Sequence, residues 1–531
     1  MELRGFLLRN NNEKWQFLYA SLIAILIIIP IILNVHLYFD DFGRSLKGTY
    51  EWSGDGRPLA EYLYRKLSLD SEYSALSRPL GLLLCIPLIA YSSIFLCRIF
   101  SNSHRWSASL AALFFFGQPY FVENLSYSYD SPLMCLAICL SLYSAYAISS
   151  NSSKYSFLLA VVFTLSSLSI YQPANTAFWI PVLFLVFSPS SSLLVEFSGC
   201  KIEDFASQFH AYTLRRLNIL SSLFLCQLIV FLSYKIFILP NLILESYTKN
   251  YSAIAPFASL PQSILSNSFA YLNIIYNDWA STPFGSLYIS LLLFSIVGKA
   301  CLTYANFSSL EITPKQLLRI VVCLCIGLLA VCLIFVFSYG VGVVLQRPVF
   351  PPRTFIGIGA FISSAVLCAT SDISFQLSPQ NIPYPLRKRL FDVFLLVILS
   401  TTAWSYVFIQ FSYASAYSRQ EALNRYFIET IVQELRYNGY GFNELNEISI
   451  KGSSPFSPLV LQTFTQLPYL KSMIRPIRPI PIDWLGHVRF KHYGFRPLKP
   501  STHLDNAQVL VSNPVYDLSV ERKRLIIFFK G

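Results

Sequence analysis

The chain has 531 residues, of which 54% are hydrophobic, 16% aromatic and only 13% charged. This shortage of charge excludes a large soluble enzyme and favours a polytopic membrane protein. The net charge of +12 comes largely from basic loops and a basic tail. No nucleic-acid-binding module accompanies these basic residues, so nucleic acid is not an expected partner.

Long apolar stretches predict membrane-spanning helices. The first runs from about Trp15 to His36, and no small-residue cleavage site follows it, which indicates an uncleaved span rather than a signal peptide. With the stretches that follow, the sequence predicts about eleven transmembrane helices. The later spans are expected near 79–97, 107–122, 131–149, 155–172, 174–188, 218–240, 285–306, 319–343, 354–372 and 390–414.

Basic residues recur before the first span and after every second span. This bias predicts a cytoplasmic amino terminus and an external carboxyl terminus, with the lipid bilayer as an obligatory partner. The 11 cysteines all fall in predicted spans or on the cytoplasmic side, so no disulfide framework is expected outside.

Two domains are expected. Residues 1–414 form an all-α transmembrane domain with a large external loop at 37–78, and residues 415–531 form a small external α/β domain. In this tail, "SRQEALNRYFIETIVQELRYNG" predicts an amphipathic helix stopped by Gly439. The runs "ISIKG", "QVLVS" and "RLIIFF" predict strands.

Two adjacent acids, Asp40 and Asp41, directly follow the first span. Partial desolvation and mutual repulsion should raise the pKa of one of them, and a carboxylate tuned in this way can accept a proton from a sugar hydroxyl. Arg44 shares their face if the segment continues as a helix. Arg57, in the turn "SGDGRPL", comes just before Pro58 at an expected helix start. Guanidinium groups bind phosphate bidentately, but acids and arginines here could also form surface ion pairs that cap helices.

A second external cluster lies in "GQPYFVENLSYSYDSPL". Its Glu123, Asn124, Tyr129 and Asp130 are of the types that contact sugar hydroxyls and sugar faces. The alternative is an interfacial aromatic belt with a polar turn.

Two further segments are expected on the same side. "IYQPANTAFW" supplies Tyr171 and Gln172, and "LQRPVFPPRTF" supplies Arg347 and Arg353. These two arginines oppose the positive-inside trend, which favours a role in holding an anion over that of a simple external anchor.

Several kinds of catalytic motif are absent from the sequence. It contains no GxxxxGK[ST] phosphate loop, no HExxH zinc site and no GxSxG elbow. No soluble nucleotide-sugar domain is evident on the cytoplasmic side either. A sugar donor should therefore be lipid-borne and presented at the outer leaflet.

Four motifs carry a resemblance to a known family. "DDFGRSLKGTYEWSGDGRPLAEYL", "PYFVENLSYSYDSPLM", "SIYQPANTAFW" and "PPRTFIGIGA", in that order, resemble the Gtr-type (type II) serotype-converting glucosyltransferases of Gram-negative bacteria and their temperate phages. The resemblance implies a GT-C type fold in the bacterial inner membrane, with the carboxyl terminus in the periplasm.

The resemblance also implies an activity. Such enzymes take glucose from undecaprenyl-phosphate glucose and attach it, with inversion, to an O-antigen sugar of lipopolysaccharide in the periplasm. Asp40 or Asp41 would then be the general base. No cofactor is expected, because arginines can meet the charge of the departing phosphate; a divalent metal between paired acids is the less favoured alternative.

The implied donor requires a donor synthase and a donor flippase as functional partners. Two other functions compete with the transferase reading. A transporter of O-antigen or lipid-linked sugar would be expected to carry broken spans and ionisable residues at mid-membrane. An O-antigen polymerase would use lipid-linked repeat units as both donor and acceptor.

Overall fold

The computed structural model describes most of the chain. The described residues are 8–74, 78–102, 104–150, 153–187, 202–282, 285–293, 325, 328–370, 386–441, 444–479, 485–492, 499–501 and 508–530. Residues 294–306 of the expected span 285–306, and residues 319–324, 326 and 327 of the expected span 319–343, therefore lie outside them.

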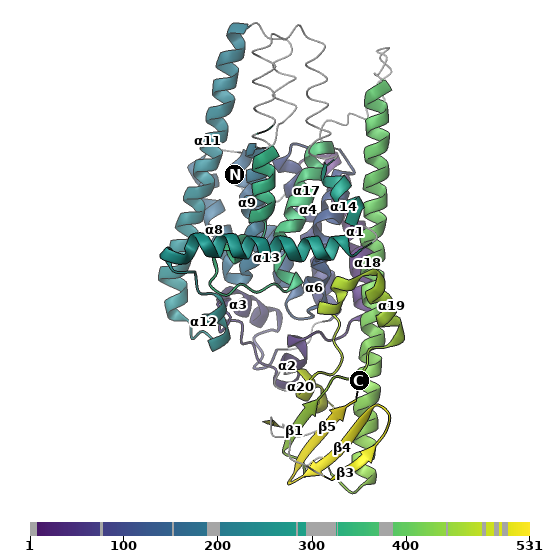
Figure 1. Ribbon diagram of the computed structural model, residues 1–531. Coiled ribbons are helices and arrows are strands. Elements are labelled where there is room, and N and C mark those ends of the chain that lie inside the picture. Colours follow the sequence, from purple (N-terminus) through teal and green to yellow (C-terminus); the bar gives the residue numbers. More distant parts are fainter. Residues whose placement is uncertain are drawn as a thin grey trace.

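A bundle of apolar helices forms the larger part of the structure (Figure 1). Small buried residues such as Ala20 and Ala24 on one face of the first helix allow close packing against its neighbours. The bundle helices are α1 (Asn11–Asn34), α4 (Leu80–Ile99), α5 (Ser107–Phe116), α7 (Ser131–Ser150), α8 (Lys154–Ile170), α9 (Thr176–Phe187), α11 (Ile202–Ser233), α14 (Gly285–Leu293), α17 (Ile356–Thr370) and α18 (Leu386–Tyr437).

Among the described residues, five helices are long and apolar enough to cross a membrane. They are Asn11–Asn34, Leu80–Ile99, Ser131–Ser150, Thr213–Asn241 and Val393–Tyr437. These helices identify the chain as a membrane protein, and the total of about eleven spans stays a prediction. The stretch expected as one span over 107–122 is divided, because α5 ends before Gly117 and a separate helix, α6 (Phe121–Ser126), follows.

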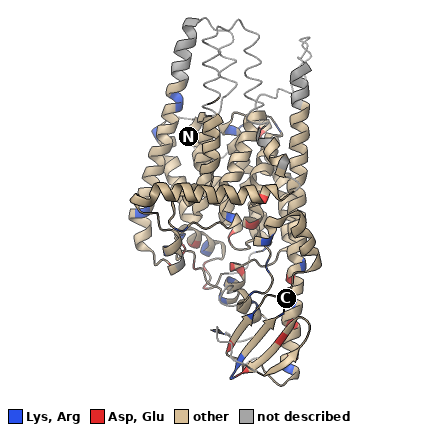
Figure 2. Ribbon diagram, in the orientation of Figure 1, with Lys and Arg blue, Asp and Glu red and all other residues tan. Residues whose placement is uncertain are grey.

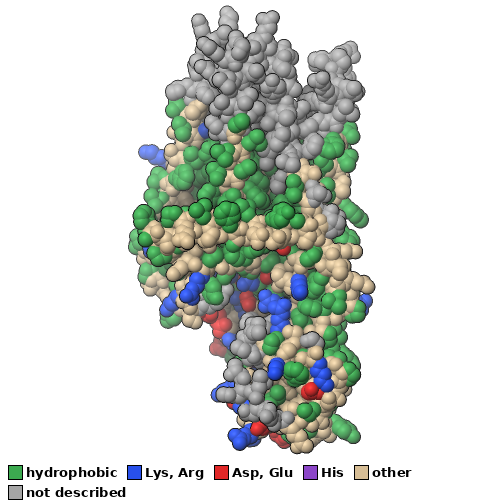
Figure 3. Space-filling model, viewed as in Figure 1, with side chains coloured by type: hydrophobic (Ala, Val, Ile, Leu, Met, Phe, Trp, Pro, Cys, Tyr) green, Lys and Arg blue, Asp and Glu red, His purple; other side chains and the backbone are tan. Residues whose placement is uncertain are grey.

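Charged residues gather at one end of the bundle. Helix α13 (Leu260–Ala280) lies across the bundle in Figure 1, and α2 (Asp40–Lys47), α3 (Pro58–Leu67), α6 and α12 (Ser246–Tyr251) lie on the side of it that faces the sheet. Figure 2 shows few charged residues along the described bundle helices and many around α2, α3 and the sheet. Figure 3 shows hydrophobic side chains over much of the described bundle surface, and most of the visible charged side chains between α13 and the end of the sheet. We call the part formed by α2, α3 and α6 the polar end.

The tail begins within a single helix. Helix α18 has 52 residues and runs without a break through the expected domain boundary at 414/415. It ends at Tyr437, and Gly439 adopts φ 83° two residues later, which is the predicted glycine stop.

A five-stranded mixed sheet packs against the last turns of α18. The strand order is β2-β1-β5-β4-β3; β1 pairs in parallel with β2 and β5, and β4 pairs antiparallel with β5 and β3. Phe427, Ile431 and Leu435 of α18 share a core with the strands. The tail elements are β1 (Glu447–Lys451), α19 (Pro458–Gln466), α20 (Leu485–Lys491), β2 (Lys499–Pro500), β3 (Val509–Ser512), β4 (Tyr516–Glu521) and β5 (Arg524–Phe529).

The three predicted strand runs are confirmed as β1, β3 and β5. Sequence analysis missed β4, which pairs with β5 through a two-residue turn. Arg522 and Lys523 take positive φ values of 45° and 68° in this turn. Such turns are usually marked by Asn-Gly or Asp-Gly, and no glycine marks this one.

Candidate active site

Asp41 is completely buried at the start of α2. Its Oδ2 accepts backbone N–H groups from Tyr38 at 3.1 Å and Ser128 at 2.7 Å, and its Oδ1 lies 3.5 Å from the N–H of Tyr129. Burial raises the pKa of Asp41 to about 7, against the lowering effect of these backbone donors. Asp41 therefore fastens α2 to the segment after α6.

Asp40, the neighbouring acid, is only partly buried. Within the described part of the chain its side chain makes no hydrogen bond or ion pair, although its charge acts on Arg44. The preceding residue, Phe39, has φ 34° and ψ −100°, a strained conformation of the kind that clusters at functional sites. Of the two acids, Asp40 has the carboxylate that is available to an incoming group.

Asp130 is the centre of a second set of contacts at the polar end. One carboxylate oxygen forms an ion pair with Arg44, and the other accepts the indole N–H of Trp52 at 2.6 Å. The Arg44 guanidinium also lies over the Trp52 ring, 4.0 Å from its centroid. Burial lowers the pKa of Arg44, but the nearby carboxylates more than offset this effect. The charge of Arg44 is therefore already neutralised within the protein.

Arg57 connects the turn before α3 to the segment after α8. Its Nη1 lies 4.0 Å from Asp130, and its Nε donates to Oε1 of Gln172 at 3.2 Å. The Arg57 guanidinium stands over the ring of Tyr171 at 5.2 Å. Gln172 Nε2 donates to the carbonyl of Gly56 at 3.2 Å. Gly56 has φ 76°, and a Cβ there would come within 2.9 Å of the Tyr234 hydroxyl, so this turn requires glycine.

Glu123 is buried on α6 and holds the segment around Arg353. Its Oε1 accepts the hydroxyl of Tyr38 at 3.2 Å, and its Oε2 accepts the backbone N–H of Arg353 at 2.7 Å. Burial raises the pKa of Glu123, and the charge of Arg353 partly counteracts it. The carbonyl of Arg353 accepts from Asn124 Nδ2 at 3.1 Å and from the Tyr171 hydroxyl at 2.7 Å. The backbone of Arg353 is thus fixed on both sides.

Two guanidinium groups lie over aromatic rings next to the acid pair. Arg353 stands over Tyr127 at 5.0 Å, and Arg475 stands over Phe39 at 4.2 Å. Both rings contact Tyr38, with centroid distances of 4.9 Å and 4.2 Å. Both arginines also act electrostatically on buried Glu123. This arrangement places two cations from distant parts of the sequence beside the start of α2.

Sequence reasoning missed Arg475, Tyr38 and Trp52. The only signal at Arg475 is its position in the Pro-rich stretch "RPIRPIPIDW", which says nothing about where the stretch docks. Trp52 lies within the first external loop, but nothing in the sequence pairs its indole N–H with Asp130.

Arg347 stands apart from the other predicted site residues. It is exposed and follows Leu345, which forms an isolated bridge with Ile254. No hydrogen bond or ion pair of its side chain connects it to the described part of the polar end. Arg353, only a few residues later, is the arginine of this loop that reaches the site.

Within the described ranges, no group of three or more His, Cys, Asp or Glu side chains is arranged to hold a metal ion.

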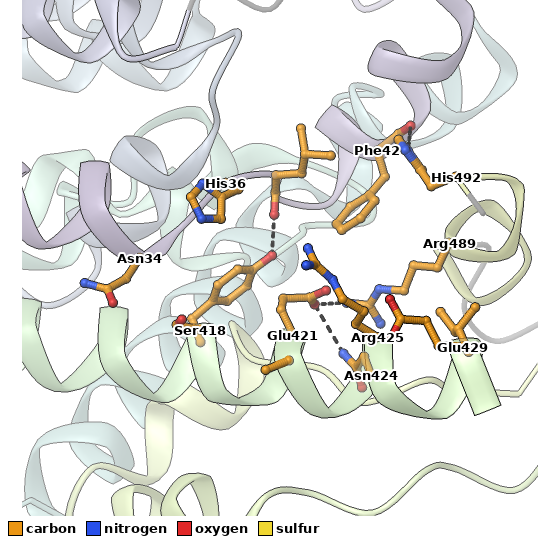
Figure 4. A pocket seen from close by; sticks show the side chains of 14 residues that line it. Asn34, His36, Phe42, Ser418, Glu421, Asn424, Arg425, Glu429, Arg489 and His492 are labelled. Carbon is orange, nitrogen blue, oxygen red and sulfur yellow. Dashed lines mark hydrogen bonds and ion pairs between the residues drawn. The ribbon is translucent and has the colours of Figure 1, made fainter. Parts of the chain in front are cut away.

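A cavity of about 570 Å³ lies between the end of α1, the segment around α2, α18 and α20 (Figure 4). We call it the α18 cavity. Leu37 and Phe42 of its lining lie on either side of Asp40 in the sequence. The lining residues are Asn34, His36, Leu37, Phe42, Tyr417, Ser418, Glu421, Ala422, Asn424, Arg425, Ile428, Glu429, Arg489 and His492.

Comparison with known proteins identifies relatives. The profile of the family described as Glucosyl transferase GtrII matches residues 29–364, a range that includes every site residue predicted from the sequence. An uncharacterized 55.3 kDa protein in the gtrB 5′ region of Salmonella phage P22 is 26% identical over 528 residues, covering 98% of this chain and 99% of that protein. The family match confirms the resemblance seen in the four sequence motifs.

Proposed function

Because the chain belongs to the Glucosyl transferase GtrII family, we propose that it moves glucose from undecaprenyl-phosphate glucose to an O-antigen sugar. The reaction would take place on the periplasmic side of the bacterial inner membrane, with the amino terminus in the cytoplasm and the polar end and tail in the periplasm. The observation that carries the proposal is the partly buried carboxylate of Asp40, which directly follows Phe39. Arg475 lies over the Phe39 ring, and Arg353 lies over Tyr127, whose ring contacts Tyr38.

In this mechanism Asp40 is the general base. It accepts the proton of the acceptor hydroxyl as that oxygen forms a bond to the anomeric carbon of glucose. The bond between the anomeric carbon and the phosphate oxygen breaks on the opposite face, which inverts the configuration. Undecaprenyl phosphate leaves with the bonding electrons, and the proton remains on Asp40 until solvent removes it.

Arg353 and Arg475 would bind the departing phosphate. Guanidinium groups match phosphate geometry and stabilise the charge that develops as the phosphate leaves. Arg44 is less suited to this role, because its charge is paired with Asp130. Metal activation is not part of the proposal, since two guanidinium groups can supply the positive charge.

The remaining predicted residues would position these groups. Asp41 orients α2 through its backbone hydrogen bonds, and Glu123, Asn124 and Tyr171 hold the backbone of Arg353. The Asp130 contacts to Arg44 and Arg57 fix the loop before α3. Tyr129 and Gln172 stay candidates for direct sugar contact.

The clustering of acids and arginines at one end of the bundle favours a transferase over a transporter (Figure 2). A transferase using this donor depends on a synthase that makes undecaprenyl-phosphate glucose and a flippase that delivers it. An O-antigen polymerase would instead lengthen the polysaccharide, which analysis of its chain length distinguishes from side-chain glucosylation.

The test compares Asp40→Asn with wild type in a host that makes undecaprenyl-phosphate glucose and a smooth O-antigen. Loss of a general base lowers rates by about 10²–10⁴-fold, so we expect glucose on the O-antigen to fall at least a hundredfold. Mass spectrometry of the released polysaccharide measures glucose, and size-exclusion chromatography of the solubilised protein checks folding. Glu51→Gln is the matched control, because Glu51 is an exposed acid of the same loop.

Two results would contradict the proposal at different levels. A wild-type protein that adds no glucose in any acceptor strain would reject the transferase function. Full transfer by Asp40→Asn would reject the assigned base and leave the function standing.

A further inference from the structure

We infer that the α18 cavity binds a short, uncharged stretch of the acceptor polysaccharide against α2, the helix that begins at Asp40. The inference rests on the proposed glucosyltransferase function and adds the location and chemistry of the acceptor site. It also gives the tail a role, because the tail supplies part of the cavity wall.

The size and position of the cavity fit an oligosaccharide segment. A volume of about 570 Å³ lies within the range of about 300–1,000 Å³ that is usual for small-molecule sites. His36, Arg425 and Glu429 line the cavity and are exposed, so a chain can enter from solvent. Leu37 and Phe42 line the cavity and belong to the same short segment as Asp40, so a bound sugar would lie against the segment that carries the proposed base.

The charges of the lining balance one another. Arg489 forms an ion pair with Glu421 through Nη2, and its Nη1 donates to the carbonyl of Pro476 at 3.4 Å. Arg425 and Glu429 are one helical turn apart on α18 and both line the cavity. Figure 4 shows the Arg425 side chain reaching from α18 toward the space between His36 and Phe42. A balanced lining favours an uncharged ligand over the phosphate of an anionic lipid, which would need a net positive site.

The polar groups of the lining match those of a sugar. Asn34 and Ser418 add an amide and a hydroxyl to the charged residues, so that both donors and acceptors line the cavity. Phe42 supplies a flat apolar ring of the kind on which pyranose faces stack.

One buried donor in the wall is unsatisfied. Arg489 is only 4% exposed, and its Nε has no hydrogen-bond partner in the part of the chain that the structure describes. Figure 4 shows this side chain extending over α18 along the cavity. A buried N–H without an acceptor is unfavourable unless a ligand or water supplies one. A sugar hydroxyl bound in the cavity can do so.

The tail helix α20 is docked on the same segment that carries the acid pair. Phe42 packs with Leu485 and Val488 of α20, and His492 Nε2 lies 3.0 Å from the carbonyl oxygen of Phe42. The Arg489 guanidinium lies 5.4 Å from the Phe42 ring centroid. The tail therefore shapes the acceptor site, which places selection of the polysaccharide partly outside the membrane bundle.

The experiment uses the full-length protein in lipid nanodiscs. The probe is O-polysaccharide released by mild acid from the smooth strain that serves as acceptor in the transfer assay. Binding is measured by saturation-transfer NMR, and KM is measured separately for polysaccharide and for undecaprenyl-phosphate glucose. The variants are Arg425→Ala and Glu429→Gln, with Arg419→Ala as the matched control. Arg419 is an exposed arginine of α18 that does not line the cavity.

We expect Arg425→Ala to raise the polysaccharide Kd and KM by about tenfold, the equivalent of one lost polar contact. Glu429→Gln should weaken binding less, and neither variant should change the KM for the lipid donor. Arg419→Ala should match wild type in every measurement.

Other outcomes would overturn the inference. Equal binding by Arg425→Ala and Arg419→Ala would show that the cavity does not hold the polysaccharide. A rise in the KM for the donor alone would place the anionic lipid there instead. If wild type binds polysaccharide, Arg425→Ala weakens that binding and no glucose is transferred, the cavity inference stands and the proposed function fails.

Discussion

Two neighbouring regions at the polar end differ in whether their charged side chains are paired within the protein. We call Asp41, Asp130, Arg44 and Trp52 the inner cluster. In it, both oxygens of each carboxylate interact with N–H groups of the protein itself. In the α18 cavity, Arg425 and Glu429 are exposed, and a buried Arg489 nitrogen has no acceptor among the described residues. The comparison teaches that conspicuous acids of the sequence such as Asp41 and Asp130 hold the protein together, whereas less conspicuous residues such as Arg425 and Glu429 keep side chains exposed at a cavity.

Removal of Asp130 is the strongest test of this difference, because Asp130 contacts both Arg44 and Trp52 of the inner cluster. Asp130→Ala leaves the buried Arg44 charge without its partner, and breaking such a pair costs about 3–5 kcal/mol. We expect a loss of that order in the free energy of unfolding of the detergent-solubilised protein, measured by denaturant titration. Glu51→Gln breaks the exposed pair with Lys47 and should cost about 1 kcal/mol or less. Equal costs for the two variants would contradict a structural inner cluster.

The pH dependence of stability sharpens the comparison further. The pKa of Asp41 rises from 3.8 when unfolded to about 7 when folded. Between pH 3.8 and about pH 7, Asp41 is protonated in the folded protein but ionised in the unfolded chain. The free energy of unfolding therefore falls as the pH rises through this interval. Thermal unfolding from pH 4.5 to 8 should show wild type losing stability across this interval. Asp41→Asn should give a flatter curve, and an unchanged slope would mean that Asp41 does not titrate there.

The smallest expected effect comes from a change within the inner cluster that keeps its shape. Trp52→Phe retains an aromatic ring beneath Arg44 but removes the N–H that Asp130 accepts. Loss of a hydrogen bond to a charged group should lower the free energy of unfolding by about 1.5–3 kcal/mol. Trp404→Phe is the control, because the Trp404 side chain is 70% exposed. Denaturant titration that fails to separate the two variants would argue against a firm Trp52–Asp130 bond.

Much of the local structure near the site could be predicted from the sequence. The segment does continue as a helix, α2, through Asp40 and Arg44, which was the condition for their sharing a face, and the expected helix start at Pro58 is confirmed as α3. The four motifs were sufficient to indicate the family, which the profile match confirms. These are local patterns of spacing and turn chemistry, which a sequence records directly.

The rest depends on how distant segments meet. Asp40 and Asp41 are adjacent in sequence, and only the strained backbone at Phe39 and the docking of residues 127–129 decide which carboxylate turns inward. Arg347 and Arg353 belong to one loop, yet only Arg353 is drawn into the site by Glu123 and Asn124. Arg475 arrives through the docking of the tail. No spacing rule encodes such meetings, because they arise from tertiary packing.

Helix α18 gives the molecule a mechanical property. At about 1.5 Å per residue, its 52 residues extend roughly 78 Å, well beyond the hydrocarbon thickness of about 30 Å. Since each residue of a helix advances the chain by about 100° of rotation, the angular phase between the bundle and the sheet is set by a residue count. Substitutions in α18 that keep the helix leave this rotation between the bundle and the sheet unchanged. One residue inserted into α18 between the bundle and the sheet would rotate Arg425 and the docked sheet away from Phe42 together. The number of residues in α18 is therefore more tightly constrained by the structure than their identity.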